Sequence, residues 1–109
     1  MERRRSARVR ADIPVITYQD GVALRARALD LSCGGALIQR TADHPPPMFQ
    51  RVDILLGPSR HVQGVARTVW AQSGMCAVHF VGLSDADRLE IAEHVDRAER
   101  RQRRLGTMR

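Results

Sequence analysis

The sequence predicts a mainly β domain in which six short antiparallel strands form a small barrel or sandwich and one helix follows at the C-terminal end. Three observations support this fold class. Short segments rich in β-branched residues recur from residue 13 to residue 81, turn-forming residues separate them, and the apolar spacing becomes helical after residue 83. A chain of 109 residues can bury one modest core, so we expect a single domain.

The first two strands form a predicted hairpin. Residues 13–18 read IPVITY, a β-branched and aromatic run, and they end at the turn-like sequence QDG at residues 19–21. Residues 22–31 are extended again, with Arg25 and Arg27 on one face and small or apolar residues on the other.

Four further strands are expected at residues 36–39, 52–56, 62–72 and 75–81. The proline run at residues 44–47 ends the first of these, because proline has no amide donor for a strand ladder. Gly64 is a candidate bulge in the long segment, and Ser73 with Gly74 predicts the turn into the last strand.

The segment LSDADRLEIAEHVDRAERRQRRLG has the spacing of a helix. Ser84 with Asp87 three residues later resembles a capping box, which predicts the helix start, and Gly106 is a natural stop. The apolar positions expected to pack on the barrel are Leu89, Ala92 and Val95. About twenty helical residues extend roughly 30 Å, so we expect the last turns to project beyond a small barrel.

Acidic residues precede arginines by four positions three times in this helix, which favours a solvated helix over a nucleic-acid-binding tail. The pairs are Glu93 with Arg97, Asp96 with Arg100, and Glu99 with Arg103.

The positive charge is concentrated at the N-terminus. All 18 basic residues are arginines, and the first ten residues hold five of them against one glutamate, which is +4 of the net charge of +6. Such an arm attracts anions in a salt-dependent manner.

The sequence predicts a cytoplasmic protein. No apolar leader and no membrane-spanning run is visible. The two cysteines, Cys33 and Cys76, are expected to be free thiols, as in a reducing compartment.

The run DLSCGG, residues 30–35, has the residue types of a binding site. The carboxylate of Asp30 can accept two hydrogen bonds side by side, as the N1–H and N2–H₂ donors of guanine require, and Ser32 can reach a phosphate or a base edge. Gly34 and Gly35 allow backbone amides to approach a ligand closely.

The arginine-rich arm supplies the complementary groups. Arg4 and Arg8 are four residues apart, and with Arg3 and Arg5 their guanidinium groups could clamp phosphates or the acceptor edge of guanine. A guanine nucleotide satisfies both the acidic and the basic part of this set.

The two motifs, RRSAR at residues 4–8 and DLSCGG at residues 30–35, resemble those of the PilZ domain family, the bacterial receptors of cyclic di-GMP. This resemblance implies a six-stranded antiparallel β-barrel with an Arg-rich N-terminal arm and a C-terminal helix. We accordingly expect the arm at residues 1–12, the barrel at 13–83 and the helix at 84–105, as a single PilZ domain with no output domain.

The resemblance also implies a function. Cyclic di-GMP would bind between arm and barrel, change the surface of the domain and so regulate an unidentified effector protein; the domain itself would be a monomer or weak dimer. The implied ligand-binding residues are Arg3, Arg4, Arg5, Arg8, Asp30, Ser32, Gly34 and Gly35. An additional arginine such as Arg3 is implied to favour a stacked pair of ligands.

Other functions fit the sequence less well. Ser32 lacks the G-x-S-x-G context of a hydrolase nucleophile, and Cys76 with His79 falls short of the four ligands of a zinc site, so we expect no enzyme, metal or cofactor. Nucleic-acid binding would favour aromatic residues among the arginines, which are absent. Trp70 is expected to fill the core, and the alternative is that it lies beside a bound guanine. The alternative function of the whole domain is a PilZ-like interaction module that binds no nucleotide.

Overall fold

The computed structural model describes residues 8–41 and 45–107, and it contains six strands and one helix. The elements, in chain order, are β1 (Val9–Gln19), β2 (Val22–Leu31), β3 (Gly35–Arg40), β4 (Phe49–Gly57), β5 (Arg60–Gln72), β6 (Met75–Gly82) and α1 (Asp85–Thr107). Arg3, Arg4 and Arg5, which are predicted to bind the ligand, lie outside the described residues.

The strands form a closed antiparallel barrel in the order β1-β2-β3-β6-β5-β4, which confirms the predicted fold class. Consecutive strands pair as hairpins, except that β3 does not pair with β4. β3 pairs with β6, and β1 pairs with β4 to close the barrel. Because every strand has two neighbours, the barrel leaves no long unpaired edge within the described residues.

Two of the hairpin turns follow directly from local sequence. Asp20 and Gly21 have φ values of 54° and 79°, and Ser73 and Gly74 have φ values of 53° and 78°. Positive φ at both central residues matches the right-handed twist of the flanking strands, and glycine adopts it without steric cost. Both predicted turns are confirmed.

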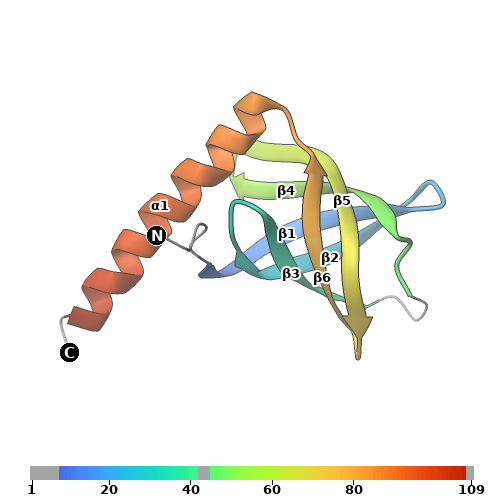
Figure 1. Cartoon of the computed structure of the whole chain (residues 1–109), viewed down its shortest axis with the longest axis horizontal. Helices are drawn as coiled ribbons and strands as arrows, with labels where there is room; N and C mark the ends of the chain where they lie inside the picture. The colour runs from blue at the N-terminus through green and yellow to red at the C-terminus, as the bar shows by residue number, and fades with distance from the viewer. Residues whose placement is uncertain (1–7, 42–44, 108–109) are drawn as a thin grey trace, which may run out of the picture.

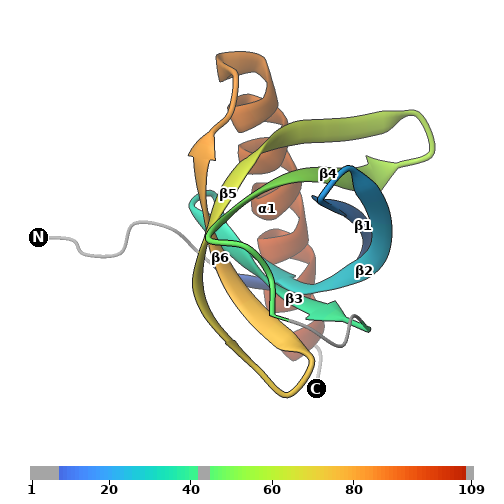
Figure 2. The same cartoon turned by 90° about the vertical axis from the view of Figure 1, so that its right-hand side faces the viewer.

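Alternating side chains of all six strands fill the barrel. The helix α1 covers one end of the barrel (Figures 1 and 2). The helix residues buried against the barrel are Ile91, Val95 and Ala98. The predicted packing of Leu89 is wrong, since its side chain is 59% exposed. The i, i+4, i+7 stripe that is buried begins two residues later and leaves Leu89 on the outer side of the helix.

The start of α1 confirms the predicted cap, because the Asp87 amide donates to Ser84 Oγ at 3.0 Å. Gly106 does not stop the helix, which continues to Thr107. Its last turns extend past the barrel (Figure 1). The ion pairs Asp96–Arg100 and Glu99–Arg103 form, whereas Glu93 and Arg97 make no ion pair within the described part of the chain.

Strand β1 begins at Val9, four residues before the strand that the sequence predicts. The register of β1 against β2 shifts between Arg10 and Ile13, yet the alternation of more buried and more exposed side chains continues from Val9 to Thr17. Residues 10–12 read RAD and lack the β-branched and aromatic residues on which the predicted strand start at Ile13 depends.

The predicted bulge at Gly64 is wrong. The register of β5 against β6 shifts after Val65 and again between Thr68 and Trp70. Gly64 serves close packing instead, since a Cβ there would lie 2.5 Å from Leu83 Cδ2. No helix among the described residues has the length and apolar character needed to cross a membrane.

Candidate functional site

Asp30 lies near the end of β2, on the outer surface of the barrel wall. The register of β2 against β3 shifts between Ala28 and Asp30, and beyond this shift Asp30 lies opposite Leu37. The amide of Leu37 donates to Asp30 Oδ1 at 3.1 Å, which fixes the orientation of the carboxylate. Asp30 Oδ2 accepts no hydrogen bond from any described residue.

Arg8, the residue before β1, contacts this carboxylate. Its Nη1 donates to Asp30 Oδ1 at 2.6 Å, and the two side chains are 55% and 23% exposed. The structure thereby brings together residues of the two motifs, which are 22 positions apart in sequence. A pair this exposed contributes little to stability, about 0–1 kcal/mol, so it can exchange partners at low cost.

Ser32 directs its hydroxyl group into its own turn rather than outward. The side chain is buried, and the amides of Gly34 and Gly35 donate to Ser32 Oγ at 3.3 and 3.2 Å. The Ser32 amide donates to the Gly35 carbonyl at 2.9 Å and closes the turn between β2 and β3. Such local side-chain bonds hold a turn in one shape.

The two glycines of the turn have different roles. Gly35 is packed against β6, where a Cβ would lie 2.1 Å from the Val78 carbonyl oxygen. Gly34 has open space around it, and its carbonyl accepts a hydrogen bond from the Phe80 amide at 2.9 Å. Only Gly35 is therefore required by close packing.

Trp70 lies on the outer surface, so the prediction that it fills the core is wrong. The register shift between Thr68 and Trp70 inserts one extra residue into β5 and turns the indole outward, where it is 48% exposed. Trp70 lies opposite Ala77, which in turn lies opposite Leu37. An exposed aromatic thus joins the face that carries Asp30, and sequence alternation alone could not reveal it.

A second acidic residue of the barrel wall, Asp53, was not among the predicted site residues. Its side chain is only 8% exposed, and Tyr18 Oη donates to Asp53 Oδ2 at 2.8 Å. The Cζ of Arg51 lies 4.5 Å from the centre of the Tyr18 ring. The hydrogen bond to Asp53 raises the pKa of Tyr18, together with partial burial and the negative charge of Asp53, while Arg51 opposes the shift.

Two other groups have shifted pKa values. Burial raises the pKa of the Cys76 thiol, with the positive charge of Arg40 acting in the opposite direction. Burial lowers the pKa of His94 on α1, and the positive charges of Arg97, Arg60 and Arg101 lower it further. Cys33 and Cys76 are both free thiols, as predicted.

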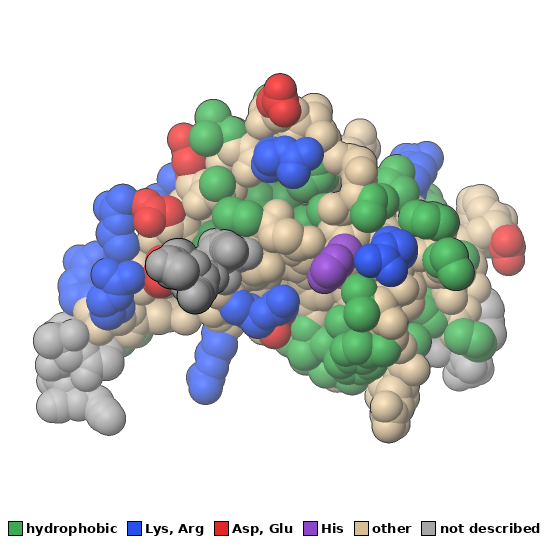
Figure 3. Space-filling view, viewed as in Figure 1, with side chains coloured by type: hydrophobic (Ala, Val, Ile, Leu, Met, Phe, Trp, Pro, Cys, Tyr) green, Lys and Arg blue, Asp and Glu red, His purple; other side chains and the backbone are tan. Residues whose placement is uncertain are grey.

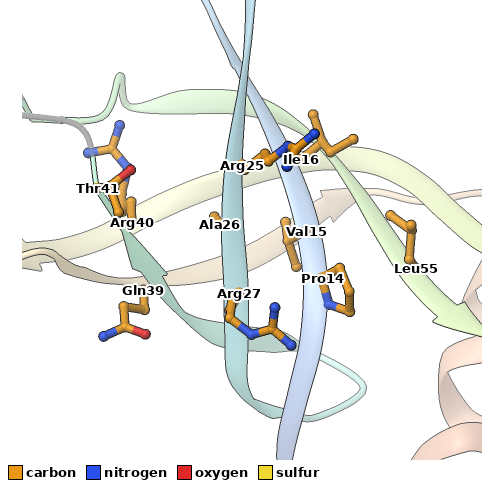
Figure 4. Close-up of a pocket in the computed structure, with 10 residues that line it drawn as sticks. All are labelled: Pro14, Val15, Ile16, Arg25, Ala26, Arg27, Gln39, Arg40, Thr41 and Leu55. Carbon is orange, nitrogen blue, oxygen red and sulfur yellow. The ribbon is translucent and has the colours of Figure 1, made fainter.

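A cavity of about 610 Å³ lies elsewhere on the barrel, between β1, β2, β3 and β4 (Figure 4). Pro14, Ile16 and Leu55 give it an apolar wall, and Arg25 and Arg27 line its side on β2. It contains none of the described motif residues. In the described ranges 8–41 and 45–107, no group of three or more His, Cys, Asp or Glu residues is placed to hold a metal ion.

Comparison with known proteins yields one family and several related folds. The family model described as PilZ domain matches residues 2–97 of the chain. No curated protein sequence matches the chain significantly.

Among solved structures, the Bacillus subtilis inhibitor of motility MotI/DgrA has a TM-score of 0.74 at 18% identity. The match covers 94% of this chain and 52% of MotI/DgrA, so the chain spans about half the length of that protein. The PilZ domain of Escherichia coli YcgR, solved with c-di-GMP, has a TM-score of 0.70 at 19% identity, covering 97% of this chain and 98% of that one.

The PilZ domain of CeSA from a cellulose-synthesizing bacterium has a TM-score of 0.67 at 20% identity, covering 85% of this chain and 98% of that chain. At these identities the likeness to the three structures shows a shared fold.

Proposed function

The chain belongs to the PilZ domain family, and from this premise we propose that it is a cyclic di-GMP receptor that regulates a partner protein. The observation that carries the proposal is the contact between Arg8 and Asp30, in which the two motifs meet on one surface. The structure of the YcgR PilZ domain with c-di-GMP supports it by analogy of fold.

In this proposal Asp30 recognises a guanine base of the ligand. Its carboxylate is held in place by the Leu37 amide through Oδ1, while Oδ2 faces no described donor. The N1–H and N2–H₂ groups of guanine are adjacent donors that suit a carboxylate, and adenine has no such pair. A fixed acceptor also costs little conformational entropy when the ligand binds.

Arg8 supplies the positive charge. In the absence of ligand Asp30 neutralises its guanidinium group across an exposed ion pair. A bound phosphate or the O6 and N7 acceptors of guanine would offer Arg8 a stronger, planar partner. We assign Arg3, Arg4 and Arg5 to the same clamp, in which ligand binding orders the arm against the barrel.

The turn between β2 and β3 forms the floor of the proposed site. Ser32 keeps the turn in shape through its bonds to the Gly34 and Gly35 amides, so we assign it a positioning role beside Asp30. Gly34 and Gly35 keep this floor free of side chains, which lets the ligand approach the backbone.

The proposal is binding without catalysis in the bacterial cytoplasm. Two free thiols suit a reducing compartment. The ordered arm and bound ligand together would form a new surface, which an effector protein reads.

The test is isothermal titration of the purified protein with cyclic di-GMP at low ionic strength. We expect micromolar or tighter binding, and we expect Arg8→Ala and Asp30→Ala each to weaken it by about tenfold or more, the loss typical of a charge-assisted hydrogen bond. The thermal unfolding midpoint of both variants should remain near that of the wild type, because the pair is exposed.

Asp12→Ala is the matched control, since Asp12 forms an exposed ion pair with Arg27 outside the motifs. It should leave the affinity unchanged. Absence of binding by the wild type would refute the receptor function and leave the nucleotide-independent interaction module.

A further inference from the structure

The outer surface of β3, β6 and β5 carries two polar side chains that belong to neither motif, His79 on β6 and Arg67 on β5. Gly35 on β3 lies opposite His79 on β6, and His79 lies opposite Arg67 on β5. These three residues form one row across the barrel wall. The side chains of His79 and Arg67 are exposed. Figure 3 shows basic and hydrophobic side chains next to one another over β5 and β6.

A parallel row begins at Asp30. Asp30 lies opposite Leu37, Leu37 opposite Ala77, and Ala77 opposite Trp70. The two rows are neighbours on the same outer face, since alternate residues of β3 and of β6 belong to them. The face with Asp30 at one side therefore continues to Arg67 at the other.

This face is wider than one base. From β2 to β5 there are three steps between adjacent strands, about 14 Å at roughly 4.8 Å per step. A guanine that is held by Asp30 covers only the first part of this distance. A cyclic dinucleotide, which has a second base on the far side of its sugar-phosphate ring, is long enough to reach further across.

The side chains of Arg67 and His79 carry hydrogen-bond donors on the part of this face that lies away from Asp30. Neither side chain makes a hydrogen bond or an ion pair with any other described residue. Most arginines on the described barrel wall are engaged instead, as Arg27 is by Asp12 and Arg60 is by Glu90.

We propose that Arg67 and His79 form a second contact region for the half of a cyclic dinucleotide that Asp30 does not reach. Arg67 donates to O6 and N7 of the second guanine, and His79, between Arg67 and Gly35, donates to the sugar-phosphate ring. The inference rests on the proposed function. It adds a reason for selecting a ligand that carries guanine at both ends.

The experiment compares cyclic di-GMP with 3′,3′-cyclic GMP-AMP, in which one guanine is replaced by adenine, by titration of the full chain. The wild type should prefer cyclic di-GMP by about tenfold, because adenine presents a donor where guanine has O6. Arg67→Ala should weaken binding of cyclic di-GMP by about tenfold. This variant should then bind cyclic di-GMP and 3′,3′-cyclic GMP-AMP with nearly equal affinity. Arg67→Lys should stay weakened, since lysine keeps the charge but lacks the planar fork.

His79→Ala should weaken binding of both ligands by roughly threefold, as expected for one hydrogen bond, and His79→Gln should recover part of it. Arg25→Ala is the matched control, because Arg25 is an exposed arginine on β2 with no hydrogen-bonding or ion-pairing partner among the described residues.

The outcomes separate the two proposals. If the wild type binds cyclic di-GMP but Arg67→Ala binds it as tightly as the wild type or the Arg25→Ala control does, the second contact region is overturned and the receptor function remains. If the wild type binds no cyclic di-GMP, the receptor function fails first, and the second contact region fails with it.

Discussion

Asp30 and Asp53 lie on the two strands that flank β1, and their surroundings differ in almost every respect. Asp30 is partly exposed, and its charged partner Arg8 lies just before the first strand. Asp53 is 8% exposed and bonded to Tyr18, whose backbone is fixed in the sheet. A carboxylate with an exposed, exchangeable partner suits ligand binding, whereas a buried one with a fixed partner suits stability.

The same contrast separates the two ends of β2. Its Asp30 end leads into a turn that is held by Ser32 and carries the motif residues. Its other end forms an ordinary hairpin at Asp20 and Gly21, shaped by positive φ values alone. The first of the two proposed guanine contacts thus lies at the Asp30 end of β2, where the turn carries the motif residues.

The largest effect is expected from the turn on the Asp30 side. Gly35→Ala places a Cβ 2.1 Å from the Val78 carbonyl oxygen, so β3 must move away from β6. We expect the free energy of unfolding in urea to fall by about 3 kcal/mol, the upper range of overpacking, with loss of ligand binding. Gly34→Ala meets no atom within 4 Å and should fold as the wild type does. Equal stability of the two variants would contradict the close packing of β3 on β6.

An intermediate effect is expected on the Asp53 side. Tyr18→Phe removes the donor to Asp53 Oδ2 and leaves a buried carboxylate without that bond. We expect a loss of about 1–3 kcal/mol in the free energy of unfolding, measured in urea, with unchanged affinity for cyclic di-GMP. Together with Asp30→Ala, which is expected to remain stable but to bind cyclic di-GMP more weakly, this variant tests the division of roles. A Tyr18→Phe protein that lost binding while remaining stable would reverse it.

The smallest effect concerns pH. Tyr18 is the one tyrosine of the chain, so absorbance near 295 nm reports its ionisation alone. Its pKa is raised from 10.0 in the folded protein, chiefly by the bond to Asp53. The native state therefore holds this proton more tightly than the unfolded state, and the stability it contributes is present below pH 10.0 and lost as pH rises through the raised value.

The Asp53→Asn variant provides the comparison for this titration. Its amide carries no charge, so the pKa of Tyr18 should fall back towards its ordinary value. A titration curve that does not move would mean that Asp53 is not the cause of the shift.

Local sequence determined the turns and the cap. Asp20-Gly21 and Ser73-Gly74 could be predicted because few residues tolerate positive φ, and Ser84 because a hydroxyl satisfies the free amides of a helix start. The resemblance implied that residues of both motifs line one ligand site, and the structure places Arg8 of the first motif in contact with Asp30 of the second.

The tertiary structure decided what depends on partners distant in sequence. The exposure of Trp70 depends on a bulge in β5 against β6, and the outward position of Leu89 depends on which stripe of α1 meets the barrel end. The inward hydroxyl of Ser32 and the burial of Asp53 likewise depend on neighbouring elements. Turn geometry follows from the sterics of adjacent residues, whereas register, bulges and helix docking are set by the packing of whole strands, which no local pattern specifies.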